Sequence, residues 1–338
     1  MSTVFLGTSE FAAAILRRLA GEPLHRPALV ITRPDRPSGR GRHVHAPAVA
    51  VSARELGISL EQPESVNDPS VLELIARSAG RSAILIVCAF GALVKEPLLS
   101  AHEILNVHPS LLPRWRGAAP IERAIMAGDQ QTGVSIMRLT AGLDSGPVCL
   151  QAAEQIRADD SFQSLSIRLQ ELGGELLVRS LSEPLPFVEQ VEEGVSYAEK
   201  ILAADRLLDR GRPAIELDRV VRALHPHIGA RIELADGGML GVHRAALLAE
   251  GSLPRAGDGD GSDGGDGSAG GGDSLLGEPD RPSRRDRPGA WDGLCERDGR
   301  LLLNASPGIL ELLEVQPPGG RAMDASAYLR GHGLPGRR

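Results

Sequence analysis

Three polar side chains carry the chemistry that this sequence could perform: the carboxamide of Asn106, the imidazole of His108 and the carboxylate of Asp144. One residue, Val107, separates Asn106 from His108, so on a β-strand both side chains project from the same face, about 6.6 Å apart. Pro109 cannot donate within a central strand, so we expect the strand to end there. In parallel sheets this carboxyl end is where ligands bind. The pair therefore flanks a space that fits one small reacting group.

These residue types suit the transfer of a carbonyl carbon to an amine. An Asn amide can stabilise the oxyanion of a tetrahedral intermediate, and losing such a donor typically costs about 2.7–4 kcal/mol. His108 can donate to the same oxygen or move a proton near neutral pH. Asp144, in a turn-rich stretch between Gly142 and Gly146, can accept from the imidazole or from the attacking amine. The sequence has no obvious nucleophile elbow and no Cys/His set at metal spacing, which favours direct transfer without a metal.

Each feature alone is weak evidence, because an isolated Asn-x-His is usually not catalytic and an Asp between glycines is more often a turn residue. The intervening string is far more specific. Residues 106–148 read NVHPSLLPRWRGAAPIERAIMAGDQQTGVSIMRLTAGLDSGPV, which resembles, almost without interruption, the family of formyltransferases that use 10-formyltetrahydrofolate. The resemblance implies that Asn106, His108 and Asp144 are the catalytic residues. It also implies that the formyl group passes to the α-amine of methionine esterified to initiator tRNA.

An α-amino group has a pKa of about 7.7, so much of it is already neutral at pH 7–8. We therefore expect positioning and oxyanion stabilisation to dominate, with Asp144 as orienter and modest proton acceptor. The family resemblance further implies a folate-contacting set. The set comprises Phe90, Gly91, Ser110, Leu111, Leu112 and Pro113. At position 90 of this sequence, Phe stands where Tyr is common in the family.

An arginine-rich stretch, residues 33–45, carries four arginines against one acid, Asp35. Its glycines and prolines argue against a helix. It could be a solvated surface loop, but it resembles the loop with which the tRNA-dependent branch of the family contacts the acceptor end, and guanidinium groups suit phosphate. The tRNA-binding residues so implied are Arg33, Arg36, Arg40 and Arg42.

The resemblance continues at both ends of the chain. Residues 5–12 resemble the family's opening strand and helix, and Ser196-Tyr197-Ala198-Glu199-Lys200 resembles the start of its C-terminal region. The stretch 224–229, LHPHIG, departs from the aromatic-rich Asn-Pro-Trp pattern that is usual in the tRNA-dependent branch. This departure leaves the catalytic residues untouched.

The first part of the chain, residues 1–183, alternates short apolar runs with helical patterns, which predicts a Rossmann-like, doubly wound α/β domain with a parallel sheet. Gly7-Thr8-Ser9-Glu10 lacks the full dinucleotide fingerprint, so a tight strand-to-helix turn is the better interpretation. We expect strands at 4–6, 28–32, 84–88, 104–108 and 133–139. We expect helices at 10–19, 47–56, 70–78, 119–127 and 161–181, the last capped by Asp160-Ser161.

After a Pro- and Glu-rich linker at 184–204, residues 205–330 carry a short helix at 220–224 and strands at 230–234, 241–246, 300–304 and 308–315. Short strands at this spacing predict a small β-barrel, and the family implies an OB-like tRNA-binding barrel. A Gly- and Asp-rich insert at about 251–288 lacks the Glu of a calcium loop. We expect it to be a disordered, self-repelling loop.

Composition sets further limits. The formal net charge is −7, but residues 256–280 contain seven acids and no Lys or Arg, so the rest of the chain is neutral. An acidic total therefore does not exclude a nucleic-acid partner. Three widely spaced cysteines argue against disulfides. No apolar run reaches a membrane span and the start lacks the basic region of a signal peptide, so we expect no membrane partner. With the cysteine pattern, this favours a cytoplasmic location. We also expect the protein to be a monomer.

Two alternatives remain. One keeps the chemistry and changes the acceptor to a small amine, such as glycinamide ribonucleotide or an amino-sugar nucleotide; the arginine-rich loop and the second domain favour tRNA. The other is a non-catalytic folate- or RNA-binding protein, against which the intact Asn106, His108 and Asp144 argue.

Overall fold

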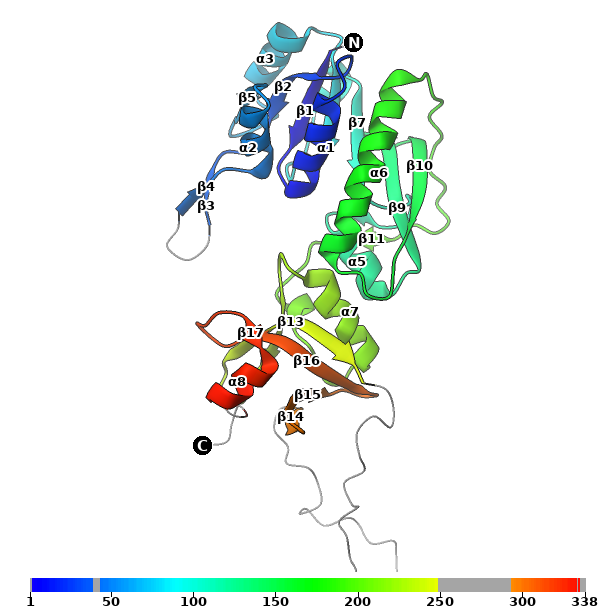
Figure 1. Cartoon of the computed structure of the whole chain (residues 1–338). Coiled ribbons are helices and arrows are strands. Elements are labelled where there is room, and N and C mark those ends of the chain that lie inside the picture. The colour runs from blue at the N-terminus through cyan, green and yellow to red at the C-terminus, as the bar shows by residue number, and fades with distance from the viewer. Residues whose placement is uncertain (1, 39–42, 249–292, 333, 335–338) are drawn as a thin grey trace, which may run out of the picture. The chain divides into compact units, whose positions relative to one another are not determined.

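The computed structural model describes residues 2–38, 43–248, 293–332 and 334. The chain forms two compact units (Figure 1): residues 1–206 with 219–229, and residues 207–218 with 230–338. The predicted α/β class of the N-terminal part is confirmed, and the C-terminal part is a separate antiparallel β-sheet. The segment predicted as a linker, 184–204, belongs to the first unit. The domain boundaries 1–183 and 205–330 stay predictions.

The first unit contains a seven-stranded sheet in the order β10-β9-β7-β6-β1-β2-β5. Strand β9 is antiparallel to both of its neighbours, β7 and β10, and the other pairs are parallel, so the sheet is mixed and not wholly parallel as predicted. The chain between β9 and β10, residues 139–147, is too short for the crossover that a parallel pair needs. The strands are β1 (Thr3–Gly7), β2 (Pro27–Ile31), β5 (Ser59–Glu61), β6 (Ile84–Cys88), β7 (Ile104–His108), β9 (Gln131–Arg138) and β10 (Val148–Gln155).

Helices cover both faces of this sheet. Ser9 caps the first helix by accepting from the Ala12 N–H, and Ser161 forms the predicted cap of the last, reciprocated by Ser164. Such caps satisfy N–H groups that have no partner within the helix. The helices are α1 (Glu10–Ala20), α2 (Ala48–Glu55), α3 (Pro69–Ala79), α4 (Leu98–Ala101), α5 (Pro120–Ala127) and α6 (Phe162–Ser182).

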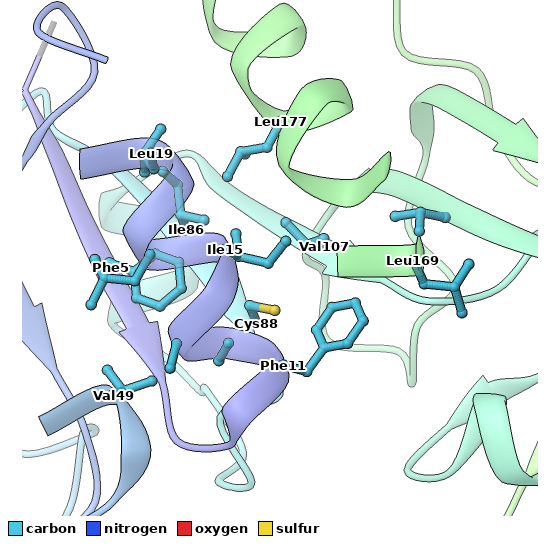
Figure 2. Packing of buried hydrophobic residues seen from close by; sticks show 14 of the residues in the cluster. Phe5, Phe11, Ile15, Leu19, Val49, Ile86, Cys88, Val107, Leu169 and Leu177 are labelled. Atoms are coloured by element: carbon cyan, nitrogen blue, oxygen red, sulfur yellow. The ribbon is translucent and has the colours of Figure 1, made fainter. Parts of the chain in front are cut away.

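Alternation along the strands divides the core into two clusters. On β1, Phe5 packs on one face, while Val4 and Leu6 pack on the other. Figure 2 shows the first cluster, in which strand residues meet side chains of α1 and α6. Cys88 is fully buried there, and burial raises the pKa of its thiol, so it is a core residue. The labelled members are Phe5, Phe11, Ile15, Leu19, Val49, Ile86, Cys88, Val107, Leu169 and Leu177.

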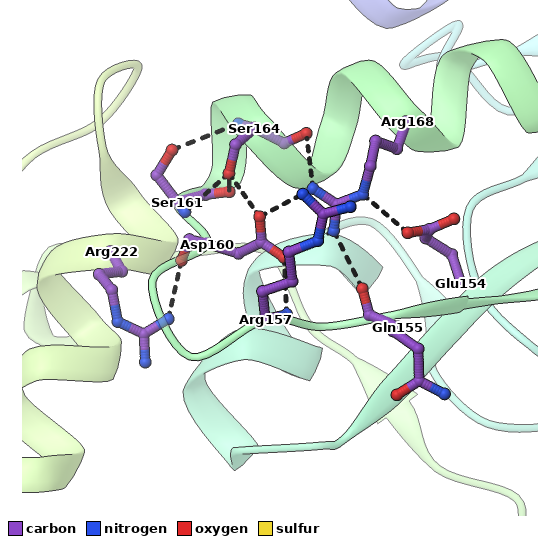
Figure 3. Close-up of polar contacts among 8 residues, drawn as sticks. All are labelled: Glu154, Gln155, Arg157, Asp160, Ser161, Ser164, Arg168 and Arg222. Atoms are coloured by element: carbon purple, nitrogen blue, oxygen red, sulfur yellow. Dashed lines mark hydrogen bonds and ion pairs between the residues drawn. The ribbon is translucent and has the colours of Figure 1, made fainter.

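A buried ionic network fixes the start of α6 (Figure 3). The Asp160 carboxylate is 3% exposed and accepts from Nη1 and Nη2 of Arg168 at 2.9 and 2.6 Å. It also accepts from the Ser164 hydroxyl at 2.7 Å and from the Arg157 N–H at 2.7 Å. Burial would raise the pKa of Asp160, but these hydrogen bonds outweigh it and lower the pKa to about 2.

We expect Asp160→Asn to destabilise the protein by about 2–3 kcal/mol at pH 7, because the buried group would lose its charge-assisted hydrogen bonds to Arg168, which would keep only its ion pair with Glu154. A carboxyl with a lowered pKa stabilises the fold above its unfolded value of 3.8, and this contribution is lost as pH falls towards about 2. The difference in unfolding free energy between wild type and variant should therefore shrink between pH 4 and pH 2. Denaturant titrations across that range measure it. Asp159→Asn, at an exposed neighbour, is the control, and a difference that stays constant with pH would contradict the assignment.

The second unit is built on an antiparallel sheet in the order β12-β13-β16-β15-β14, with β17 paired to β16. Closure into an OB-like barrel stays a prediction. Strand β14 was not predicted, and the insert at 251–288, between β13 and β14 in sequence, lies outside the described residues. In sequence, helix α7 (Ala214–Leu224), whose residues from Arg219 onward belong to the first unit, precedes the sheet, and α8 (Ala325–His332) follows it. The strands are β12 (Ala230–Glu233), β13 (Met239–Leu247), β14 (Leu294–Arg297), β15 (Arg300–Asn304), β16 (Ile309–Gln316) and β17 (Met323–Asp324).

Candidate active site

Strand β7 carries two of the predicted catalytic residues at its carboxyl end. Asn106 and His108 are 7% and 4% exposed. Val107 packs into the cluster of Figure 2 and Ile104 into the opposite cluster, so the side chains alternate as the sequence predicts. The strand is fixed between β6 and β9, where His108 pairs with Ser135.

Asp144 reaches these two residues from the loop between β9 and β10. Its Oδ1 accepts from Asn106 Nδ2 at 3.3 Å, and its Oδ2 accepts from the Gly117 N–H at 2.9 Å. The Asp144 backbone has φ +44°, a left-handed conformation that Asp tolerates better than most residues. A Cβ at Gly146 would stand 2.0 Å from the Arg138 carbonyl oxygen, so the loop closes tightly onto β9. The structure thus brings all three predicted side chains together.

The hydrogen bonds of His108 define what its ring can do. Nε2 lies 2.9 Å from the Trp115 carbonyl oxygen, which can only accept, so Nε2 carries a hydrogen. Nδ1 lies 3.7 Å from Asp144 Oδ2, which is too long for a hydrogen bond. In the neutral ring Nδ1 is therefore an unprotonated acceptor beside a carboxylate. This geometry suits proton transfer better than donation to an oxyanion.

The predicted folate run folds back onto β9. Ser110 is fully buried and donates to the Arg114 carbonyl, while its own carbonyl accepts from the Ser135 hydroxyl. The Leu112 N–H donates to the same hydroxyl, and its side chain is 5% exposed. Only Leu111 and Pro113 of the four keep partly exposed side chains. In this run the backbone is held by hydrogen bonds, and only the side chains of Leu111 and Pro113 are accessible to a ligand.

Two cavities border this run. One, of about 330 Å³, lies beside Leu111 and Trp115. The other, of about 300 Å³, lies beside Leu112, Pro113 and Gln190. A cavity of about 520 Å³ in the second unit contains none of the predicted site residues. In the part of the chain that the structure describes, no group of three or more His, Cys, Asp or Glu could hold a metal ion.

The remaining predicted folate residues follow β6. Phe90 is buried, and its carbonyl accepts from the Thr8 hydroxyl at 2.7 Å. Gly91 has φ +70°, and its carbonyl accepts from Arg33 Nη1 at 2.7 Å. Arg33, predicted to contact tRNA, therefore braces the loop that was predicted to contact folate.

The arginine-rich stretch forms a hairpin of β3 (Arg36–Ser38) and β4 (His43–His45). Arg36 is exposed at its start. Arg40 and Arg42 lie outside the described residues. The exclusion of a helix is consistent with the described part.

Several site residues were missed by sequence reasoning because they act through the backbone. Trp115, at φ +63°, supplies the carbonyl that holds His108, and Gly117 supplies the N–H that holds Asp144. Their segment pairs through β8 (Arg116–Gly117) with β11 (Tyr197–Ala198), which precedes the short 3-10 helix η1 (Ala204–Arg206).

The departure at 224–229 has a local role in the first unit. The His227 ring stacks on Phe162 with centroids 3.8 Å apart, and its Nε2 lies 2.9 Å from Glu122 Oε1. His227 thus links this stretch to Glu122 of α5 and Phe162 of α6.

Comparison with known proteins extends the picture over both units. Residues 1–181 match the family model described as formyl transferase, and residues 200–333 match that of the formyl transferase C-terminal domain. The chain is similar to methionyl-tRNA formyltransferase of Paracoccus denitrificans, with 38% identity over 100% of this chain and 99% of that protein. It is also similar to the enzyme of the same name from Dechloromonas aromatica, with 37% identity over 99% and 97%.

Solved structures share the fold at low sequence identity. HypX from Aquifex aeolicus in complex with tetrahydrofolic acid aligns with a TM-score of 0.59 and 14% identity, covering 99% of this chain and 48% of that chain. An N-formyltransferase from Helicobacter canadensis, in complex with folinic acid and dTDP-3-aminofucose, aligns with a TM-score of 0.58 and 13% identity, covering 92% and 98%.

Proposed function

The chain belongs to the formyl transferase family, and from that premise we propose that it transfers the formyl group of 10-formyltetrahydrofolate to the α-amine of methionyl initiator tRNA. The similarity to methionyl-tRNA formyltransferases along the whole chain supports this acceptor. The convergence of Asn106, His108 and Asp144 supports the site. We also propose that the protein acts as a cytoplasmic monomer.

In the proposed reaction the neutral amine attacks the formyl carbon, and the carbonyl oxygen becomes an oxyanion in a tetrahedral intermediate. One hydrogen of Asn106 Nδ2 is engaged by Asp144, which leaves the other free to donate to this oxyanion. The nitrogen loses a proton to the His108 Nδ1 and Asp144 pair. The bond from carbon to N10 of the folate then breaks, and N10 takes up the proton that the pair accepted. Formyl-methionyl-tRNA and tetrahydrofolate leave.

For the donor we propose contacts from Leu111 and Pro113 side chains and from the backbone of Ser110 and Leu112, with the loop of Phe90 and Gly91 alongside. For the acceptor we propose Arg36, Arg40 and Arg42, with Arg33 as a brace between the two binding loops.

The deciding experiment mixes purified protein with 10-formyltetrahydrofolate and methionyl initiator tRNA, then detects formylmethionine by mass after deacylation. Parallel reactions offer glycinamide ribonucleotide and an amino-sugar nucleotide as acceptors. Formylmethionine in the tRNA reaction supports the proposal. Formylation of a small amine instead would replace the acceptor and leave the family and donor unchanged.

Replacing both Arg40 and Arg42 by alanine should raise KM for the tRNA about tenfold or more. It should also make the salt dependence of KM shallower, because fewer phosphate contacts mean that fewer counterions are released when the tRNA binds. The affinity for the folate should change little. Steady-state kinetics at several salt concentrations measure both. Arg77→Ala, at an exposed arginine of α3, controls for the change in charge, and equal losses for both substrates would make the loop structural.

A further inference from the structure

Gln190 lies behind the catalytic aspartate, on an otherwise largely exposed stretch. Its Nε2 donates to the carbonyl oxygens of Asp144 and Gly146, each at 2.8 Å. Its Oε1 accepts from Nε of Arg116 at 3.0 Å, and Arg116 is 4% exposed. Both hydrogens of Nε2 and one acceptor position of Oε1 are thus directed at the active-site loop and its neighbour.

The partners fix the orientation of this amide. Two carbonyl oxygens can only accept, and the guanidinium can only donate, so reversing the amide would oppose like groups at all three contacts. Val188 anchors the stretch through reciprocal backbone bonds with Val148, at 2.8 and 2.9 Å. The side chains on either side of Gln190 in this stretch, Val188 and Val191, are each 65% exposed. Gln190 is therefore held inward by its hydrogen bonds and not by burial of its surroundings.

The same stretch continues to the backbone that holds the catalytic side chains. The Trp115 N–H donates to the Ser196 hydroxyl at 3.0 Å, and the Arg116 N–H donates to the Ser196 carbonyl at 2.9 Å. A Cβ at Gly117 would stand 2.7 Å from the Ala198 carbonyl oxygen, so the two segments are in close contact. This pairing sets the Trp115 carbonyl beside His108 and the Gly117 N–H beside Asp144.

We propose that Gln190 is a positioning residue for formyl transfer, which holds the Asp144 loop in its left-handed conformation and so aims the carboxylate at Asn106 and His108. The inference rests on the proposed function for its kinetic consequence. The physical reason is that a site built on a loop keeps its geometry only if supporting hydrogen bonds restrict the backbone. A misplacement of about 1 Å can cost about 100-fold in rate.

Two variants separate the contacts of Gln190. Gln190→Glu keeps the size and the acceptor for Arg116 but donates to neither carbonyl, whereas Gln190→Leu removes all three contacts. We expect each to lower kcat at least about tenfold, with KM for tRNA and folate affinity changed less than about threefold. Glu189→Gln, at the exposed neighbour, should leave kcat unchanged. Should Gln190→Leu fail to fold, Gln190→Glu carries the test.

Two further readouts distinguish positioning from general support. In an Asp144→Asn background, adding Gln190→Glu should cost less than about threefold, because both changes disable the same group. Amide hydrogen exchange of residues 139–147, which needs no substrate, should accelerate in both Gln190 variants. Unchanged exchange or an additive loss of rate would overturn the role of Gln190. Inactivity of the wild-type protein would overturn the proposed function alone, since exchange still decides the inference.

Discussion

Replacing Asp144 by asparagine is expected to lower the single-turnover rate of formyl transfer at least about 100-fold. The new amide would be similar in shape, but it could no longer accept from both Asn106 Nδ2 and the Gly117 N–H while taking up charge. It would also leave His108 Nδ1 without an anionic neighbour, so the imidazolium formed during the reaction would be less stable. Rapid mixing with excess enzyme, quenched and analysed for formylmethionine, measures the chemical step.

The affinity for the folate should stay within about threefold of wild type, because the lost interactions act on the reacting atoms and not on ground-state binding. Equilibrium fluorescence or calorimetric titration of the donor checks this. Glu103→Gln is the matched control, since Glu103 is an acid at the other end of β7 whose ion pair with Arg138 is partly exposed. A full single-turnover rate in Asp144→Asn would remove the aspartate from the mechanism.

For the strand that carries Asn106 and His108, the bounds predicted from the sequence match those in the structure at both ends. The apolar run at 104–105 and the stop at Pro109 place the ends of β7 where the structure has them. Helix α6 was likewise expected within one residue at each end, because Ser161 is a recognisable cap. Local signals of this kind depend on neighbouring residues, which the sequence lists in order.

Contacts between residues that are distant in sequence were harder to predict. The residue types suggested that Asp144 acts with Asn106 and His108, but 38 positions separate Asp144 from Asn106, and the family resemblance was needed to support their proximity. The carbonyl of Trp115 and the N–H of Gly117 were not predicted, because every residue except proline has both groups and only the loop conformation selects them. Gln190 gave no signal in a polar, exposed stretch.

Two strands of the first sheet, β10 and β5, were not predicted, because their strand propensity is low and only pairing with a neighbour makes them strands. Strand β10 contains Gln, Ala and Glu, which are poor strand formers, and β5 has only three residues. Pairing with β9 and β2, respectively, overrides those propensities. The reversed direction of β9 follows from the short connection to β10, which could be recognised only once β10 was identified as a strand.

Asn106→Ala is expected to lower kcat about 100- to 1,000-fold, the usual cost of losing one oxyanion donor. Among the three proposed catalytic side chains, Asn106 has the most donor capacity available. His108 Nε2 is already committed to the Trp115 carbonyl, and an ionised Asp144 donates nothing. One hydrogen of Asn106 Nδ2 is engaged by Asp144 Oδ1, and the geometry leaves the second for the developing charge. Single-turnover kinetics with saturating donor and acceptor measure the change.

The substitution also removes a hydrogen bond to Asp144, so part of the loss could arise from a displaced carboxylate. The double variant Asn106→Ala, Asp144→Asn separates the two effects. If Asn106 acts only by orienting Asp144, the double variant should be no slower than Asp144→Asn alone. We expect it to be slower by at least about tenfold, because oxyanion stabilisation persists when the proton acceptor is impaired. Equal rates for the double variant and Asp144→Asn would assign the asparagine to orientation and leave the oxyanion to another donor.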